Sequence, residues 1–86
     1  MNQVATQTSQ DIQKWLISWL CEELNVEAQE IDVNEPFVNL GVSSRQAVVL
    51  MGDLENWLGF EIDPSLAWEY PTIQDLSEYL TNPKDE

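Results

Sequence analysis

Apolar residues recur at helical spacing in three separate segments of this 86-residue chain, and this pattern restricts the fold more than any other feature. The spacing predicts long helices over residues 9–24 and 44–58 and a shorter helix over residues 73–81. One or two helical turns are expected around residues 65–69. We therefore predict an all-α fold, a bundle of three main helices plus one short helix. The apolar faces comprise Ile12, Trp15, Leu16, Trp19, Leu20 and Leu24, then Ala47, Leu50, Met51, Leu54 and Leu58, then Ile73, Leu76, Tyr79 and Leu80.

Short hydroxyl side chains mark the expected helix starts, because their oxygen atoms accept hydrogen bonds from the first N–H groups of a helix. Ser43 and Gln46 match a capping box, in which each side chain bonds the backbone of the other residue. Gly59 is placed to end the helix that begins there. The other two N-caps are expected at Thr8 or Ser9 and at Thr72.

Residues 25–40 form a long connection without a steady hydrophobic period. A connection of this length inside a compact domain is often functional. Its scattered apolar residues are expected to pin the loop against the bundle. They are Val26, Ile31, Val33, Phe37 and Leu40.

The length permits one domain, residues 1–86, with a folded core over about 9–81 and polar tails at both ends. Cys21 is the only cysteine, so no internal disulfide is expected, and we predict a small buried side chain there. A polar start without a secretory signal and the lack of an apolar run of ~20 residues predict a cytoplasmic protein with no membrane span. We expect a monomer.

Sixteen acidic against three basic residues give a formal net charge of −13. This charge excludes nucleic acid as a partner and favours encounters with basic proteins. The chain has no histidine, the usual general base near neutral pH. We therefore predict that the protein is not an enzyme and has no catalytic residues. The acids of the loops lack calcium-loop spacing, and no metal site is expected.

Ser44 is the candidate for chemistry that another protein performs on this chain. It falls in the first turn of the predicted second helix, where an attached anion would lie near unpaired N–H groups in a favourable field. Serines at helix starts usually only cap the helix, so position alone leaves both interpretations open.

The segment over residues 37–50 resembles the attachment motif of acyl carrier proteins and carrier domains. The segments over residues 59–62 and 68–76 also look like the third and fourth helical region of that family. The resemblance implies that Ser44 receives a covalent 4′-phosphopantetheine from coenzyme A, added by a phosphopantetheinyl transferase with magnesium. The arm's thiol would then hold acyl groups as thioesters. The matching residues are Phe37, Leu40, Gly41, Val42, Ser44, Ala47, Val48 and Leu50.

Two neighbours of Ser44 depart from the family pattern. Ser43 stands where an aspartate is usual, which raises the question of which serine is modified, and Arg45 stands where a leucine is usual. Arg45 is placed to contact the phosphate or an acid on a partner; a solvated charge is the alternative. The following helix is also more apolar than in carriers of fatty acid synthesis. The expected partner-binding residues are Arg45, Val48, Val49, Gly52, Asp53 and Glu55.

The chain looks most like carriers of bacterial polyketide or lipopeptide pathways that are loaded by fatty acyl-AMP ligases. That similarity implies an acyl carrier that presents its chain to a tailoring enzyme or a polyketide synthase. Two alternatives stay open. One is a non-carrier interaction module with a degenerate carrier fold, suggested by the missing aspartate; the other is a peptidyl carrier.

Overall fold

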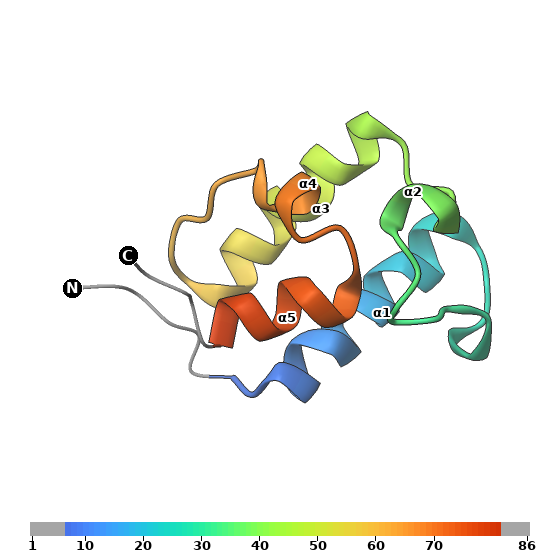
Figure 1. The fold of residues 1–86 in the computed structure, drawn as a ribbon, viewed down its shortest axis with the longest axis horizontal. Coiled ribbons are helices and arrows are strands. Elements are labelled where there is room, and N and C mark those ends of the chain that lie inside the picture. The colour runs from blue at the N-terminus through green and yellow to red at the C-terminus, as the bar shows by residue number, and fades with distance from the viewer. Residues whose placement is uncertain (1–6, 82–86) are drawn as a thin grey trace.

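The computed structural model describes residues 7–81 and shows an all-α bundle (Figure 1). The predicted fold class is confirmed, and the predicted terminal tails lie largely outside the described residues. Two short elements within the connection over residues 25–40 were not predicted, because a single turn carries too few residues for a 3.6-residue period to emerge. The elements are α1 (Ser9–Leu24), the 3₁₀ turn η1 (Ala28–Glu30), α2 (Phe37–Leu40), α3 (Ser44–Leu58), α4 (Leu66–Glu69) and α5 (Ile73–Thr81).

The helix ends follow the local signals in the sequence. Thr8 caps α1: its Oγ1 accepts a hydrogen bond from the Asp11 N–H at 3.1 Å, and the Asp11 carboxylate accepts one from the Thr8 N–H. Ser43 and Gln46 form the predicted capping box of α3. Gly59 ends α3 with φ 88°, a left-handed conformation that glycine adopts without steric cost.

The core lies where the apolar faces of α1, α3 and α5 meet. Ile12, Leu16 and Leu20 of α1 are fully buried, as the helical spacing predicted. Trp15 and Trp19 were predicted in the core but are only partly buried, because both lie towards the edge of α1 that faces α3. Cys21 is likewise partly buried rather than buried. The other long helices contribute Ala47, Leu50, Met51 and Leu54 from α3 and Ile73, Leu76 and Leu80 from α5.

Polar and aromatic contacts join α1 to α3 along what we call the α1–α3 seam. The rings of Trp15 and Trp57 stack with centroids 5.5 Å apart. One turn further along α1, Trp19 Nε1 donates to Asp53 Oδ2 at 2.7 Å. Gln46 Nε2 donates to Glu23 at 3.3 Å at the start of α3. As the residue number rises along α1 in these three contacts, the number of the partner residue falls along α3. The two helices therefore run antiparallel.

The connection over residues 25–40 is tied to the segment that joins α4 to α5. The Phe37 N–H donates to the Pro71 carbonyl at 2.8 Å, and the Gln74 N–H donates to the Val33 carbonyl at 3.0 Å. Phe37 and Ile31 are buried, which confirms that the apolar residues of the connection pin it to the bundle. These bonds hold α2 beside the start of α5, and α2 leads directly into α3.

No helix within residues 7–81 is both long enough and apolar enough to span a bilayer. The same part of the chain contains no group of three or more potential metal-ligating side chains.

Candidate functional site

Ser44 is the first residue of α3 and is exposed at a sharp corner of the chain. Gly41 ends α2 with φ 103°, a left-handed turn that redirects the backbone towards α3. Val42, the next residue, is buried and its N–H bonds the Phe37 carbonyl at 3.1 Å. A fixed turn and a buried anchor therefore present the Ser44 hydroxyl at the surface.

The two adjacent serines have different surroundings. Ser43 Oγ accepts a hydrogen bond from the Gln46 N–H at 3.1 Å, and the Ser43 N–H donates to Gln46 Oε1 at 2.9 Å. The Ser43 hydroxyl is thus engaged in the N-cap. The Ser44 hydroxyl has no hydrogen-bond partner among residues 7–81. Of the two hydroxyls, only that of Ser44 is free for reaction without breaking the capping box.

The start of α3 is electrostatically suited to an anion such as a phosphodiester. The N–H groups of Ser44 and Arg45 have no acceptor within the helix, and the helix dipole places partial positive charge there. The first turn of α3 contains no acidic residue. A phosphopantetheine on Ser44 would therefore fit this position, held by the covalent bond to Oγ, and would supply a thiol able to carry a thioester.

An exposed strip runs along α3 from its first turn. Its members are three or four residues apart, the spacing of neighbours on one face of a helix. Val48 and Val49 are 59% and 50% exposed, and a Cβ atom added at Gly52 would meet nothing within 4 Å. We call this strip the outer face of α3, and it consists of Arg45, Val48, Val49, Gly52 and Asn56.

Asp53 and Glu55, predicted with the partner-binding residues, lie at opposite edges of this strip. Asp53 turns towards α1 and accepts the hydrogen bond from Trp19. Glu55 is partly buried on the other side, where its Oε2 accepts the Ile62 N–H at 2.9 Å. The Trp19 contact joins residues 34 positions apart, and no local sequence pattern identified it. No sequence signal identified the Ile62 contact.

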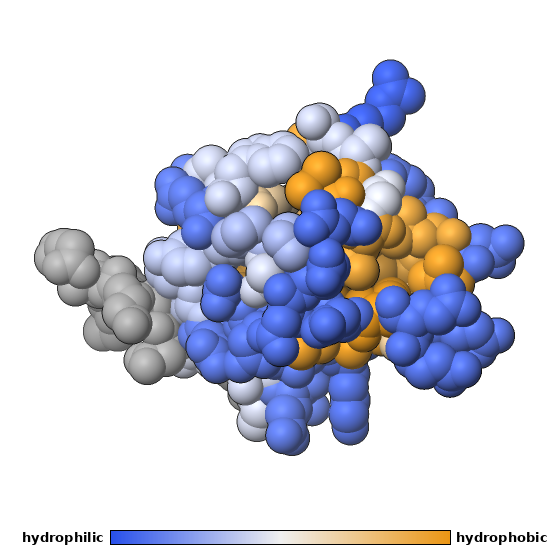
Figure 2. Space-filling model, turned by 45° about the vertical axis from the view of Figure 1, so that its right-hand side comes forward, coloured by the Kyte–Doolittle hydropathy of each residue, from blue (hydrophilic) through white to orange (hydrophobic). Residues whose placement is uncertain are grey.

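Two exposed apolar residues outside α3 were not among the predicted site residues. Val38 on α2 is 67% exposed and Trp68 on α4 is 58% exposed. The view in Figure 2 brings forward the side on which α2 lies, and apolar surface gathers there within a rim of hydrophilic side chains. The sequence signal for Val38 was its position between Phe37 and Leu40, the two apolar residues expected to pin this part of the connection.

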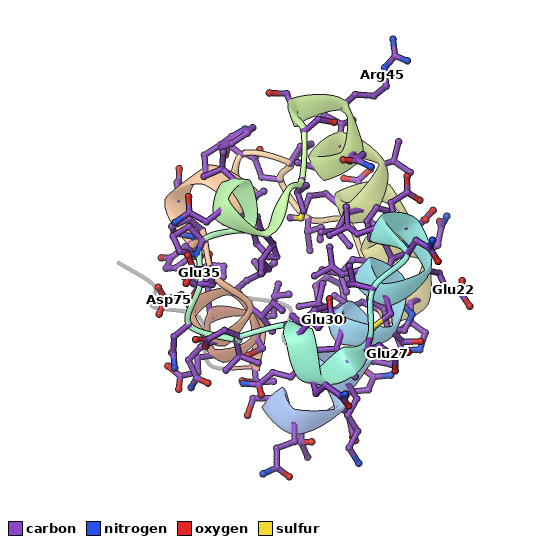
Figure 3. All side chains as sticks on the ribbon, turned by 90° about the vertical axis from the view of Figure 1, so that its right-hand side faces the viewer. Glu22, Glu27, Glu30, Glu35, Arg45 and Asp75 are labelled. Carbon is purple, nitrogen blue, oxygen red and sulfur yellow. The ribbon has the colours of Figure 1, made fainter. Side chains whose placement is uncertain are left out.

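Arg45 stands apart from the acidic residues labelled in Figure 3. In Figure 3 its side chain extends away from the ribbon, while Glu22, Glu27, Glu30, Glu35 and Asp75 lie elsewhere around the bundle. Arg45 has no hydrogen-bond or ion-pair partner among residues 7–81. The guanidinium group is therefore available to a group outside this chain.

Comparison with known sequences identifies a family whose members resemble this chain. The family model described as "Phosphopantetheine attachment site" matches residues 14–80. A phenolphthiocerol/phthiocerol polyketide synthase of Mycobacterium tuberculosis is 42% identical over 74 residues, 86% of this chain. This chain spans only 4% of the length of that synthase polypeptide. The acyl carrier protein TtuC of Teredinibacter turnerae is 31% identical over 87% of this chain and 86% of its own length.

Solved structures agree with the sequence relatives. An acyl carrier protein of Anabaena, described as having a variant phosphopantetheinylation-site sequence, is 40% identical with a TM-score of 0.81, covering 93% of this chain and 91% of its own. A free-standing peptidyl carrier protein of Acinetobacter baumannii is 34% identical with a TM-score of 0.79, covering 85% and 91%. The family carries covalently attached 4′-phosphopantetheine, and its members carry substrates for other enzymes. The matched segment includes the corner at Ser44, and the chain belongs to the phosphopantetheine-attachment family of carrier proteins.

Proposed function

We propose that this protein is an acyl carrier whose phosphopantetheine is attached at Ser44. The observation that carries the assignment is the capping box, which engages the Ser43 hydroxyl and leaves that of Ser44 exposed and without a partner in the described chain. Ser43 replaces the usual aspartate in its capping role, so the departure from the motif does not disturb the start of α3. The Anabaena relative, described as having a variant site sequence, supports a functional carrier with an altered motif.

In the attachment reaction the carrier supplies the nucleophilic hydroxyl and no catalytic base. The Ser44 Oγ forms a bond to the phosphorus that bears the pantetheine, and the bond from that phosphorus to the adenosine bisphosphate part of coenzyme A breaks. The hydroxyl proton leaves to a base of the transferase, since this chain has no histidine to receive it. The chain contributes position: a hydroxyl at an exposed corner, beside N–H groups that favour the negative charge of the product.

The cargo we propose is an acyl chain of a polyketide or lipopeptide pathway. Relatives that are polyketide synthases or an acyl carrier protein support it. A fatty acyl-AMP ligase would load the thiol with the acyl group of its adenylate, releasing AMP. The thioester would then pass to a tailoring enzyme or a polyketide synthase. A peptidyl carrier is the second candidate, favoured by the likeness to the Acinetobacter protein.

Intact-mass spectrometry tests the attachment site. Incubation with coenzyme A, magnesium and a broad-specificity phosphopantetheinyl transferase should add the mass of one phosphopantetheine. The Ser44→Ala variant should show no gain, whereas Ser43→Ala should still be modified. No gain in the wild-type chain, beside a control carrier that is modified, would leave the non-carrier interaction module as the function. Gain in Ser44→Ala but not in Ser43→Ala would move the site to Ser43.

The cargo is tested on the modified protein. A panel of fatty acyl-AMP ligases with fatty acids of several lengths is compared with a panel of amino-acid-adenylating enzymes, with ATP present in every reaction. Thioester formation with ligases alone supports the acyl carrier. Thioester formation with amino acids alone identifies a peptidyl carrier. The Ser44→Ala variant controls for acylation elsewhere, for example at Cys21.

A further inference from the structure

We infer that Arg45 is a positioning residue for the phosphopantetheine arm, because its guanidinium group pairs with the phosphodiester that modification attaches to Ser44. The pair holds the base of the arm at the start of α3 when no partner enzyme is bound. The inference rests on the proposed attachment at Ser44 and goes beyond it, since the attachment itself requires only the serine hydroxyl.

The folded chain gives Arg45 no stabilising role. Its side chain is exposed, extends away from the ribbon (Figure 3) and has no hydrogen-bond or ion-pair partner among residues 7–81. The helix dipole disfavours a cation in the first turn of a helix, so an arginine here does not help α3 to form. Arg45 is therefore an unpaired cation whose counterpart is not found in the described part of the unmodified chain.

Modification supplies an anion one residue away from Arg45. The phosphorus is bonded to Ser44 Oγ, and consecutive α-carbons lie about 3.8 Å apart, so the phosphate and the arginine side chain start from adjacent positions. Neighbouring side chains leave a helix in different directions. No contact fixes the Arg45 side chain, however, so it is free to adopt a rotamer that reaches the phosphate. A guanidinium group binds phosphate oxygens through two parallel hydrogen bonds, which favours this pair over a contact between simple point charges.

No carboxylate in the first turn of α3 competes with the phosphate for Arg45, because that turn contains no acidic residue. Glu23 reaches the start of α3 from α1, but within residues 7–81 it accepts its hydrogen bond there from Gln46, at 3.3 Å, and makes no ion pair with Arg45. The unpaired N–H groups at the same helix end also favour an anion. The phosphodiester is therefore met by these N–H groups and by the guanidinium group together.

Arg45 is the only arginine of the chain, so its Nε–H group gives a single, assignable signal in a ¹H–¹⁵N NMR spectrum. The experiment compares this signal before and after the ¹⁵N-labelled protein is fully modified with coenzyme A, magnesium and a broad-specificity transferase. Modification should shift the signal and slow the exchange of the Nε proton with water by about twofold to fivefold, as expected for an exposed ion pair. Concentrated salt should reverse both changes, because it screens exposed charges.

The ³¹P resonance of the modified protein tests the same pair from the phosphate side. Arg45→Gln removes both the charge and the planar guanidinium group and should shift this resonance. Arg45→Lys keeps the charge and should shift it less. Lys14→Gln is the matched control, since it makes the same change in net charge on the exposed surface of α1, and it should leave the ³¹P resonance unchanged. Retained backbone amide spectra would show that each variant is folded.

An Arg45 Nε–H signal that gains no protection from exchange in the fully modified protein would overturn the inference while leaving the proposed function intact. Equal ³¹P shifts in Arg45→Gln and Lys14→Gln would also overturn it, because net charge rather than a specific pair would then set the resonance. A wild-type chain that gains no mass, or that is modified at Ser43, contradicts the proposed function itself and the inference with it.

Discussion

Replacing Gly52 with alanine is expected to stabilise the protein, because this glycine lies in the middle of a long helix. Gly52 has helical backbone geometry within α3 and exposed surroundings. An added Cβ atom would meet nothing within 4 Å, so the methyl group causes no clash and gains no contact. The change in stability then comes from the backbone alone. Alanine exceeds glycine in helix propensity by about 0.8–1.0 kcal/mol.

The expected result is a rise of about 1 kcal/mol in the free energy of unfolding, which corresponds to about 4–8 °C in Tm for a domain of this size. Urea denaturation of the unmodified protein, followed by circular dichroism, measures it. The slope of free energy against urea should be unchanged, because the exposed surface of neither state changes.

Gly59→Ala is the matched control. Gly59 also has nothing within 4 Å of an added Cβ atom, but its φ of 88° is left-handed. Alanine there is expected to destabilise by about 1–2 kcal/mol. A Gly52→Ala variant that loses stability, or two variants that change in the same direction, would refute the reasoning. If Gly52→Ala is more stable yet is modified more slowly by the transferase, the glycine serves the docking of a partner.

Three further outcomes are expected from the contacts of single side chains. Ser43→Ala removes the N-cap of α3 and should cost about 1 kcal/mol in urea denaturation, while an unchanged stability would contradict the cap. Trp19→Phe keeps an aromatic ring but removes the donor to Asp53. We expect a loss of about 1–1.5 kcal/mol that disappears in an Asp53→Ala background, because alanine cannot accept the hydrogen bond. The backbone N–H of Ser65 lowers the pKa of Asp63. Asp63 therefore contributes stability that is present above its unfolded-state pKa and is lost as pH falls through the lower folded-state pKa. The difference in unfolding free energy between wild type and Asp63→Asn should shrink in acid. A difference independent of pH would contradict this reasoning.

The sequence alone was sufficient to predict the features that depend on residues close together in the chain. The capping box of Ser43 and Gln46, the stop at Gly59 and the buried faces of the long helices are all determined within a few residues of the chain. Ser44 was singled out by position and resemblance, and the structure adds that its hydroxyl is not engaged by the cap.

Features that depend on residues distant in sequence were not predicted. Asp53 and Glu55 were grouped with the outer face of α3, and only the contacts with Trp19 and Ile62 reveal that their carboxylates turn to its edges. The helix α2 was missed for a related reason. One turn of helix is not stable alone in water, and α2 depends on a hydrogen bond from Phe37 to Pro71 that no local pattern encodes.

That bond between Phe37 and Pro71, with the one between Gln74 and Val33, has a consequence for the order of folding. Joining segments so far apart closes a loop of about 35 residues, at an entropic cost of about 3 kcal/mol. The long helices can form before this closure, so the α2 corner that presents Ser44 is expected to be completed last and to open first. Amide hydrogen exchange should then be faster at Phe37 and Gln74 than in the middle of α1. The carrier would combine a persistent helical frame with an attachment corner that opens locally without global unfolding.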